Sequence, residues 1–257
     1  MDDTLYLKTY PELLGEKLGS GSFGHVYASK LDPSMCIKMS NKQNDVNYCR
    51  QWSNEYHKII TLTTRLEEDS RYKKLSFVKI IKPTEFVESS TLCYMEMPRI
   101  FRPVFEDDDK KNEFVTVQPQ LGHKNVSIIH RGRGQFVGLK QIKPLFEEDD
   151  LEKACYELGV MIGLIHYVGK NNALDTELFL GREYKYSKYR FYIADFDLTT
   201  EIKQFNDKTI EELRSSLSDI PYYPKPSVNR KLFTLFYNGY CAIVPSSLAE
   251  RVFIDYD

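Results

Sequence analysis

The stretch at residues 18–27, LGSGSFGHVY, limits the possible folds of this chain more than any other. Gly19, Gly21 and Gly24 follow the spacing G-x-G-x-x-G, and Val26 comes two residues later. Glycines at this spacing let a β-hairpin approach a polyphosphate without Cβ clashes, so that backbone N–H groups donate to phosphate oxygens. The same spacing is also typical of the strand-to-helix turn of a dinucleotide-binding fold. The segments that follow distinguish the two.

The residues after the glycine loop favour the hairpin. Residues 13–30 predict two strands around the loop, and residues 35–39 predict a third strand that carries Lys38. Apolar residues then recur at helical spacing over residues 44–61, and Glu55 lies in that predicted helix, 17 residues after Lys38 (55 − 38). The lysine therefore follows the glycine loop on a strand rather than on a helix.

Glycine loop, strand lysine and helix glutamate in this order resemble the small lobe of a protein kinase. The resemblance implies that Lys38 contacts the α- and β-phosphates of ATP and pairs with Glu55. It also implies that residues 77–81 and 91–97 are strands four and five of the same lobe, and that the chain near Glu96 and Met97 binds the adenine. The implied nucleotide contacts in the loop are Gly19, Ser20, Gly21, Ser22, Phe23, Gly24 and Val26.

The middle of the chain departs from the kinase pattern. A protein kinase has mainly helix after this point, whereas residues 115–120, 126–130 and 136–142 predict short strands. The charge run at residues 106–111, EDDDKK, predicts a solvated loop. Arg131 and Arg133 lie in a glycine-containing turn, which we interpret as a hairpin tip rather than as a phosphate or RNA contact.

A long helix is predicted at residues 146–168, and the equivalent kinase helix leads into the catalytic loop H-R-D-x-x-x-x-N, of which neither the HRD nor the usual Asn is present here. His166 near the end of that helix is interpreted as structural. Aligning the next short strand with its kinase counterpart places Asn172 at the position of the catalytic aspartate and Glu177 at that of the metal-binding asparagine. Asp175 lies three residues after Asn172 and is an alternative proton acceptor if the loop is remodelled.

Residues 190–198, RFYIADFDL, supply a metal motif similar to D-F-G. By this resemblance Asp195 holds Mg²⁺ that bridges the phosphates, and Glu177 is a second oxygen ligand. Asp197 replaces the usual glycine, which predicts restricted movement of the segment that follows. Beyond Asp197 only two helices are predicted, at residues 210–217 and 230–244, so the platform for a protein substrate is reduced or absent.

Residues 219–226, DIPYYPKP, extend the resemblance to nearly the whole chain. Together with residues 99–103, 172–181 and 195–197, this loop is similar to segments of a fungal family of kinase-like proteins of unknown function. Some members of that family are labelled zinc-finger-like, but these residues offer no zinc-ligand spacing. The loop itself is interpreted as a rigid element that closes the second lobe.

The expected fold class is α+β, with the bilobal arrangement of a protein kinase. Residues 1–98 are predicted to form a β-rich N-lobe, and residues 99–257 a reduced, mostly helical C-lobe with a strand-rich insertion at about 101–145. The two lobes together make one kinase-like domain.

Composition limits the partners and the compartment. The net charge of −2 argues against a protein that binds nucleic acid through phosphate contacts, and no segment predicts a signal peptide or a membrane span. The five cysteines are scattered and odd in number, so neither a disulfide framework nor a zinc site is expected. We therefore expect an intracellular protein, cytoplasmic or nuclear, whose partners are a nucleotide and an unidentified protein substrate or partner.

Two functions remain open from the sequence. The first is an atypical phosphotransferase that uses ATP and Mg²⁺, with Lys38, Glu55, Asp195 and Glu177 at its centre. The second is a pseudokinase, which binds nucleotide or only a partner protein, because the aspartate expected at position 172 is an asparagine.

Overall fold

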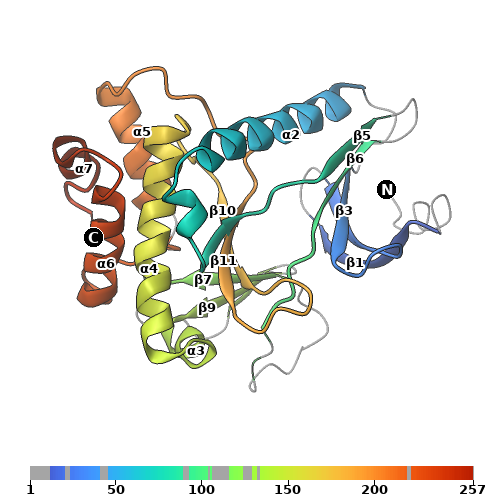
Figure 1. The fold of residues 1–257 in the computed structure, drawn as a ribbon, viewed down its shortest axis with the longest axis horizontal. Helices are drawn as coiled ribbons and strands as arrows, with labels where there is room; N and C mark the ends of the chain where they lie inside the picture. The colour runs from blue at the N-terminus through green and yellow to red at the C-terminus, as the bar shows by residue number, and fades with distance from the viewer. Residues whose placement is uncertain are drawn as a thin grey trace.

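A computed structural model shows a mixed α+β protein with a β-sheet region at one end and a helical region at the other (Figure 1). It describes residues 12–20, 24–40, 46–88, 93–103, 105, 116–123, 129–131, 134–218 and 221–256. The long helix α2 (Val46–Glu67) extends from the sheet region toward the helical region.

The N-terminal part forms a five-stranded sheet with the order β1-β2-β3-β6-β5. Its strands are β1 (Leu14–Ser20), β2 (Gly24–Ser29), β3 (Met35–Ser40), β5 (Glu85–Glu88) and β6 (Cys93–Pro98). All neighbours are antiparallel, and Lys38 on β3 lies opposite Met95 on β6. The predicted hairpin around the glycine loop and the lysine-bearing strand are both present.

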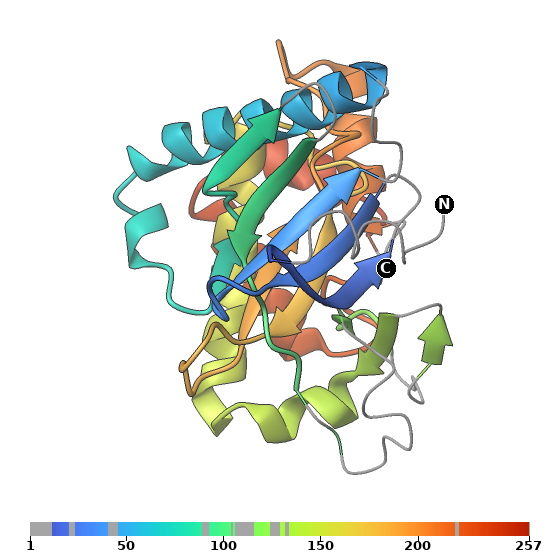
Figure 2. The ribbon, with the colours of Figure 1, turned by 90° about the vertical axis from the view of Figure 1, so that its right-hand side faces the viewer.

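Helix α2 lies along one side of this sheet (Figure 2). It continues six residues beyond the predicted end at residue 61, because Leu62 and Leu66 extend the apolar face. Cys49, Trp52 and Ile59 on the same helix are buried as the helical spacing predicts.

A disulfide joins Cys49 on α2 to Cys93 on β6, with Cα atoms 5.7 Å apart. The expectation that the chain forms no disulfide is therefore wrong for this pair. Cysteine count and spacing missed the disulfide, because two residues 44 positions apart become neighbours only when α2 packs on the sheet. The cysteines consequently no longer support the prediction of a reducing compartment.

A second sheet of three strands has the order β10-β11-β4. It consists of β10 (Glu177–Gly181), β11 (Arg190–Ala194) and β4 (Val78–Ile80). The strand expected at residues 77–81 is present, but it pairs in parallel with β11 and does not belong to the N-terminal sheet. The fourth strand of the N-terminal sheet in chain order is instead β5, which lies at the sheet edge beside β6 and which the sequence analysis did not predict.

A third sheet comes from the middle of the chain and has the order β7-β9-β8. Its strands are β7 (Thr116–Gln120), β8 (Ile129–Arg131) and β9 (Gly134–Gly138). The predicted strand at residues 136–142 is half wrong, because its second part forms the short helix α3 (Leu139–Ile142), followed by the 3₁₀ turn η2 (Lys143–Leu145). The predicted loop at residues 106–111 lies outside the described residues.

The C-terminal part is mainly helical. It contains α4 (Glu148–Gly163), α5 (Asp207–Ser218), α6 (Arg230–Cys241) and α7 (Ser246–Val252), with a π-helical turn η3 (Leu164–Val168) after α4. A 3₁₀ turn η1 (Tyr72–Lys74) follows α2 earlier in the chain. Helix α7 was not predicted. None of the described helices has the length and apolar character needed to cross a membrane.

Helices α4 and α6 pack with their backbones in close contact. A Cβ atom at Gly159 would lie 1.9 Å from the carbonyl oxygen of Phe236, and one at Gly239 would lie 2.1 Å from that of Tyr156. His166 is buried beside these helices, and its Nδ1 lies 3.0 Å from the hydroxyl of Tyr240. The structural interpretation of His166 agrees with this position.

Candidate functional site

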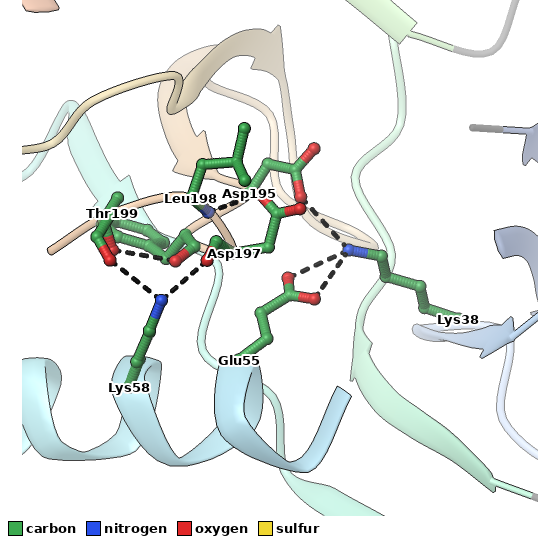
Figure 3. Close-up of polar contacts among 8 residues, drawn as sticks. Lys38, Glu55, Lys58, Asp195, Asp197, Leu198 and Thr199 are labelled. Atoms are coloured by element: carbon green, nitrogen blue, oxygen red, sulfur yellow. Dashed lines mark hydrogen bonds and ion pairs between the residues drawn. The ribbon is translucent and has the colours of Figure 1, made fainter. Parts of the chain in front are cut away.

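The predicted lysine and glutamate meet in the structure. Lys38 points from β3 toward α2, and its Nζ lies 3.0 Å from Oε1 and 3.3 Å from Oε2 of Glu55 (Figure 3). Both side chains are largely removed from solvent, with 21% of the Lys38 side chain and 6% of that of Glu55 exposed. The fold therefore holds a cation at a defined position between the sheet and the helix.

Asp195 completes this arrangement from a third element. It follows the buried strand β11, and its Oδ1 lies 3.4 Å from Nζ of Lys38. Its backbone has a φ of 63°, the left-handed region that non-glycine residues seldom adopt. This conformation occurs just where the chain leaves β11, at the residue expected to hold Mg²⁺.

The charges in this cluster affect one another. Burial disfavours the charged form of Lys38, but the carboxylates of Glu55 and Asp195 outweigh burial and raise the pKa of the ammonium. Burial also raises the pKa of Glu55, and Lys38 opposes that rise. The ammonium group of Lys38 therefore stays protonated, and its two carboxylate partners fix its position.

The ring of Trp52 contacts Lys38, and the sequence analysis did not identify Trp52 as a site residue. Lys38 Nζ lies 5.1 Å from the centroid of the Trp52 ring, within the range of a cation–π contact. The same ring explains Gly24, since a Cβ atom there would lie 2.5 Å from Cζ2 of Trp52. Gly24 is therefore required by packing, whereas a Cβ at Gly19 would meet only the Val26 side chain, at 3.7 Å.

These residues line a cavity of about 1470 Å³. From the predicted nucleotide contacts, the lining includes Gly19, Ser20, Gly24, Val26 and Met97, whereas Gly21, Ser22 and Phe23 lie outside the described residues. Glu96 does not line the cavity, and its carbonyl oxygen accepts a hydrogen bond of 2.8 Å from the backbone N–H of Thr84. The cavity is larger than the 300–1,000 Å³ of usual small-molecule sites, because its lining extends from the glycine loop to Arg65 and Tyr222.

Glu177 lines the same cavity at the start of β10. It pairs with Ala194 across the sheet, which places it beside Asp195. Burial, and next the charge of Asp195, raise the pKa of the Glu177 carboxyl to about 7. A hydrogen bond from Gln118 on β7 opposes the rise, so the strand-rich middle of the chain supplies a contact to the site. No pattern in the sequence singled out Gln118.

Asn172 does not enter the cavity. Its side chain is 1% exposed, and its Nδ2 donates to Oγ1 of Thr200 at 2.8 Å and to Oε2 of Glu212 at 3.3 Å. Its Oδ1 accepts from the backbone N–H groups of Thr200 and Leu174. Asn172 is therefore a structural residue that ties the loop before β10 to the segment after Asp197.

Asp175 lies at the edge of the acidic cluster. Its side chain is exposed, and its backbone has a φ of 62°. Burial is the main cause of the raised pKa values of Glu177, Asp197 and Tyr222, and the charge of Asp175 adds a smaller effect to each. Asp175 does not line the cavity either, but of the two predicted candidates for a proton acceptor it is the one whose side chain reaches solvent.

The loop at residues 221–226 closes one wall of the cavity. Pro221 and Tyr222 line it, and the carbonyl oxygen of Pro221 accepts a hydrogen bond of 2.9 Å from the backbone N–H of Gly122. Tyr223 is buried and hydrogen-bonds to Thr176 in the loop before β10. The loop therefore adds Tyr222 to the site, while its role in closing a second lobe stays a prediction.

The donor set suits a divalent cation that also binds phosphate. Within the part of the chain that the structure describes, no three His, Cys, Asp or Glu side chains converge on a preformed metal centre. Mg²⁺ is usually held by one or two carboxylates, with substrate phosphates and water as the other ligands. Asp195 and Glu177 meet that requirement and are the residues that would hold it.

Comparisons with known proteins add no relative to this description. The sequence matches no protein-family model, and a search of curated proteins finds no significant match.

Proposed function

We propose that this chain is a kinase-like protein that binds ATP with Mg²⁺ and transfers the γ-phosphoryl group to a hydroxyl. The observation that carries the proposal is the placement of Lys38 between Glu55 and Asp195 on the wall of a large cavity. Three elements far apart in the sequence supply these residues in the order typical of a protein kinase. The family resemblance and the division into two lobes at residue 98 belong to the same proposal.

Each residue has a defined role. Lys38 supplies the fixed cation for the α- and β-phosphates, and Glu55 keeps that cation in place. Asp195 and Glu177 would hold Mg²⁺, which neutralises charge on the phosphates when it is bound. The glycine loop and Val26 cover the nucleotide, and Met97 lies at the adenine end.

The transfer step needs a proton acceptor. The acceptor hydroxyl oxygen forms a bond to the γ-phosphorus, the bond from that phosphorus to the β–γ bridging oxygen breaks, and ADP leaves with the electron pair. Asp175 takes the proton of the hydroxyl, because its carboxylate is exposed beside the acidic cluster. Asn172 has no part in the step, since its side chain is occupied by Thr200 and Glu212.

A pseudokinase is the second candidate. The sequestered Asn172 favours it, because the position expected to hold the catalytic aspartate carries no carboxylate. Loss of a general base lowers the rate of the transfer step by about 10²–10⁴-fold, but it does not remove the residues that bind the nucleotide. Such a protein would bind nucleotide, or only a partner protein, without turnover.

Calorimetric titration with Mg²⁺–ATP tests nucleotide binding. Lys38→Met should weaken binding by about tenfold or more, since it removes the cation. Lys82→Met is the matched control, because Lys82 pairs with Glu67 on the surface and does not line the cavity. Absence of binding in the wild-type chain would overturn the ATP-based proposals.

A phosphate-transfer assay then separates the two candidates. If the chain is an enzyme, Asp175→Asn should lower turnover by about 10²-fold while leaving Mg²⁺–ATP affinity unchanged. Wild-type binding without phosphate release, autophosphorylation or transfer would instead identify a pseudokinase. Equal turnover in Asp175→Asn and wild type would remove Asp175 from the mechanism.

A further inference from the structure

A second lysine on α2 contacts the segment that follows Asp195. Lys58 Nζ donates a hydrogen bond of 2.7 Å to the carbonyl oxygen of Asp197 and one of 2.9 Å to that of Thr199 (Figure 3). Both acceptors are backbone atoms at positions 139 and 141 residues further along the chain. Neither Lys58 nor this contact belongs to the residues that the kinase resemblance assigns.

The turn that Lys58 contacts is held on its other side as well. The Thr199 hydroxyl donates to the carbonyl oxygen of Phe196 at 2.8 Å and accepts from Nδ2 of Asn171 at 3.0 Å. Phe196 is fully buried. The turn at residues 196–199 is thus fixed to the core from one side and to α2 from the other.

Lys58 and Glu55 are three residues apart on α2 and therefore lie on the same side of the helix. Glu55 holds Lys38, and Lys58 holds the carbonyl groups beyond Asp195. A movement of α2 that separates Glu55 from Lys38 also separates Lys58 from its acceptors. Two turns further on, Nη1 of Arg65 donates to the carbonyl oxygen of Gly169 at 3.3 Å, which extends the same attachment.

We propose that Lys58 is a positioning residue that couples the position of α2 to the position of Asp195. The inference rests on the proposed function in one respect, namely that Lys38 and Asp195 bind the phosphates and the metal ion. A ligand that binds Asp195 then also favours the position of α2 that forms the Lys38–Glu55 ion pair. By thermodynamic reciprocity, a partner that holds α2 in this position raises the affinity for nucleotide.

The chain contains its own reporter for this coupling. Trp52 is the single tryptophan, it lies on α2 six residues before Lys58, and its side chain is buried against Lys38. The fluorescence of Trp52 therefore reports whether α2 is packed against Lys38, and this measurement needs no nucleotide. This readout keeps the inference testable even if ATP is not the ligand.

The experiment compares Lys58→Met with Lys58→Arg and with Arg50→Met, an exposed position near the start of the same helix. Lys58→Met should make Trp52 emission shift to longer wavelength and become more accessible to acrylamide, with the chain still folded by circular dichroism. It should also weaken Mg²⁺–ATP binding by about tenfold, the factor that corresponds to one charged hydrogen bond. Lys58→Arg should restore most of both properties, and Arg50→Met should change neither.

The outcomes separate this inference from the proposed function. Unchanged Trp52 fluorescence in folded Lys58→Met would overturn the positioning role, whatever the wild-type chain binds. A shift in Trp52 fluorescence with no Mg²⁺–ATP binding by the wild type would support the attachment and overturn the proposed function. If Lys58→Met does not fold, Lys58→Gln replaces it, because the amide keeps a donor but loses the charge. A shift of Trp52 emission that Lys58→Arg reverses would then support the inference, and unchanged emission would overturn it.

Discussion

The N-terminal sheet and the C-terminal helices are stabilised in different ways. Among the described residues, the buried clusters of the sheet are small, one formed by Leu14, Tyr27, Ile37 and Met39 and another by Leu18, Ala28 and Cys36. The helices and the other two sheets instead share one continuous apolar core. The part that carries Lys38 therefore depends more on specific links, namely a disulfide and ion pairs, whereas the C-terminal part depends on close packing.

The largest expected effect comes from the disulfide. Replacing both Cys49 and Cys93 by Ser should lower the free energy of unfolding by about 4 kcal/mol, from the loop entropy of a 44-residue separation. Urea unfolding measures the loss, and Cys241→Ser, which removes a free thiol, is the control. A double variant as stable as the wild type would show that the sheet does not depend on this link.

The contact between α4 and α6 should be more sensitive to added volume than the Gly19 position of the glycine loop. Gly159→Ala places a Cβ atom against the backbone of α6 and should destabilise the chain by about 3 kcal/mol. Gly19→Ala in the N-terminal sheet has space for its methyl group, and we expect a change below about 1 kcal/mol. Thermal unfolding of the two variants measures both changes. Equal losses of stability would contradict the expected difference between Gly159 and Gly19.

The buried His166 should make the helical part sensitive to acid. Burial lowers the pKa of His166 from 6.5 to about 3, so between these values the unfolded chain binds the proton and the folded chain does not. The contribution of His166 to stability should therefore fall as the pH drops below about 6.5, by at most about 1.4 kcal/mol per pH unit. His166→Gln should flatten this slope and His57→Gln, at an exposed position, should not, as measured by urea unfolding from pH 7 to pH 5.

The candidate site should respond to pH with the opposite sign and over a narrower range. Because the pKa of Glu177 is raised from 4.5 to about 7, the folded chain holds a proton in that window and the unfolded chain does not. The contribution of Glu177 to stability should fall as pH rises through this window, and Glu177→Gln should remove that dependence. Mg²⁺ affinity should rise over the same range, because the metal ion binds the ionised carboxyl. Titration with Mg²⁺ at pH 6 and pH 8 tests this, and equal affinities would exclude Glu177 as a ligand.

The sequence predicted the elements of the site better than their connections. Strand β3, helix α2 and strand β11 were expected from alternation and helical spacing, and Lys38, Glu55 and Asp195 do meet. Glu96 and Asn172 were expected to face the nucleotide, but neither lines the cavity. The Glu96 carbonyl oxygen accepts from Thr84, and the Asn172 side chain donates to Thr200. An alignment by spacing gives no information on which way a loop side chain turns.

Several features were decided only by tertiary structure. Three contacts join segments far apart in the sequence. They are the disulfide between Cys49 and Cys93, the pairing of β4 with β11, and the hydrogen bond from Gln118 to Glu177. Lys58 is the clearest example, since its partners are backbone carbonyl groups, which every residue has.

By itself, then, the sequence determined which residues can supply a cation, a carboxylate partner and an acidic metal ligand, because periodicity and residue chemistry are local properties. The tertiary structure decided that Lys38 is held between Glu55 and Asp195, that Asn172 is turned away, and that α2 is attached to the turn after Asp195. These depend on the packing of distant segments, and that packing leaves no periodic signal in the sequence.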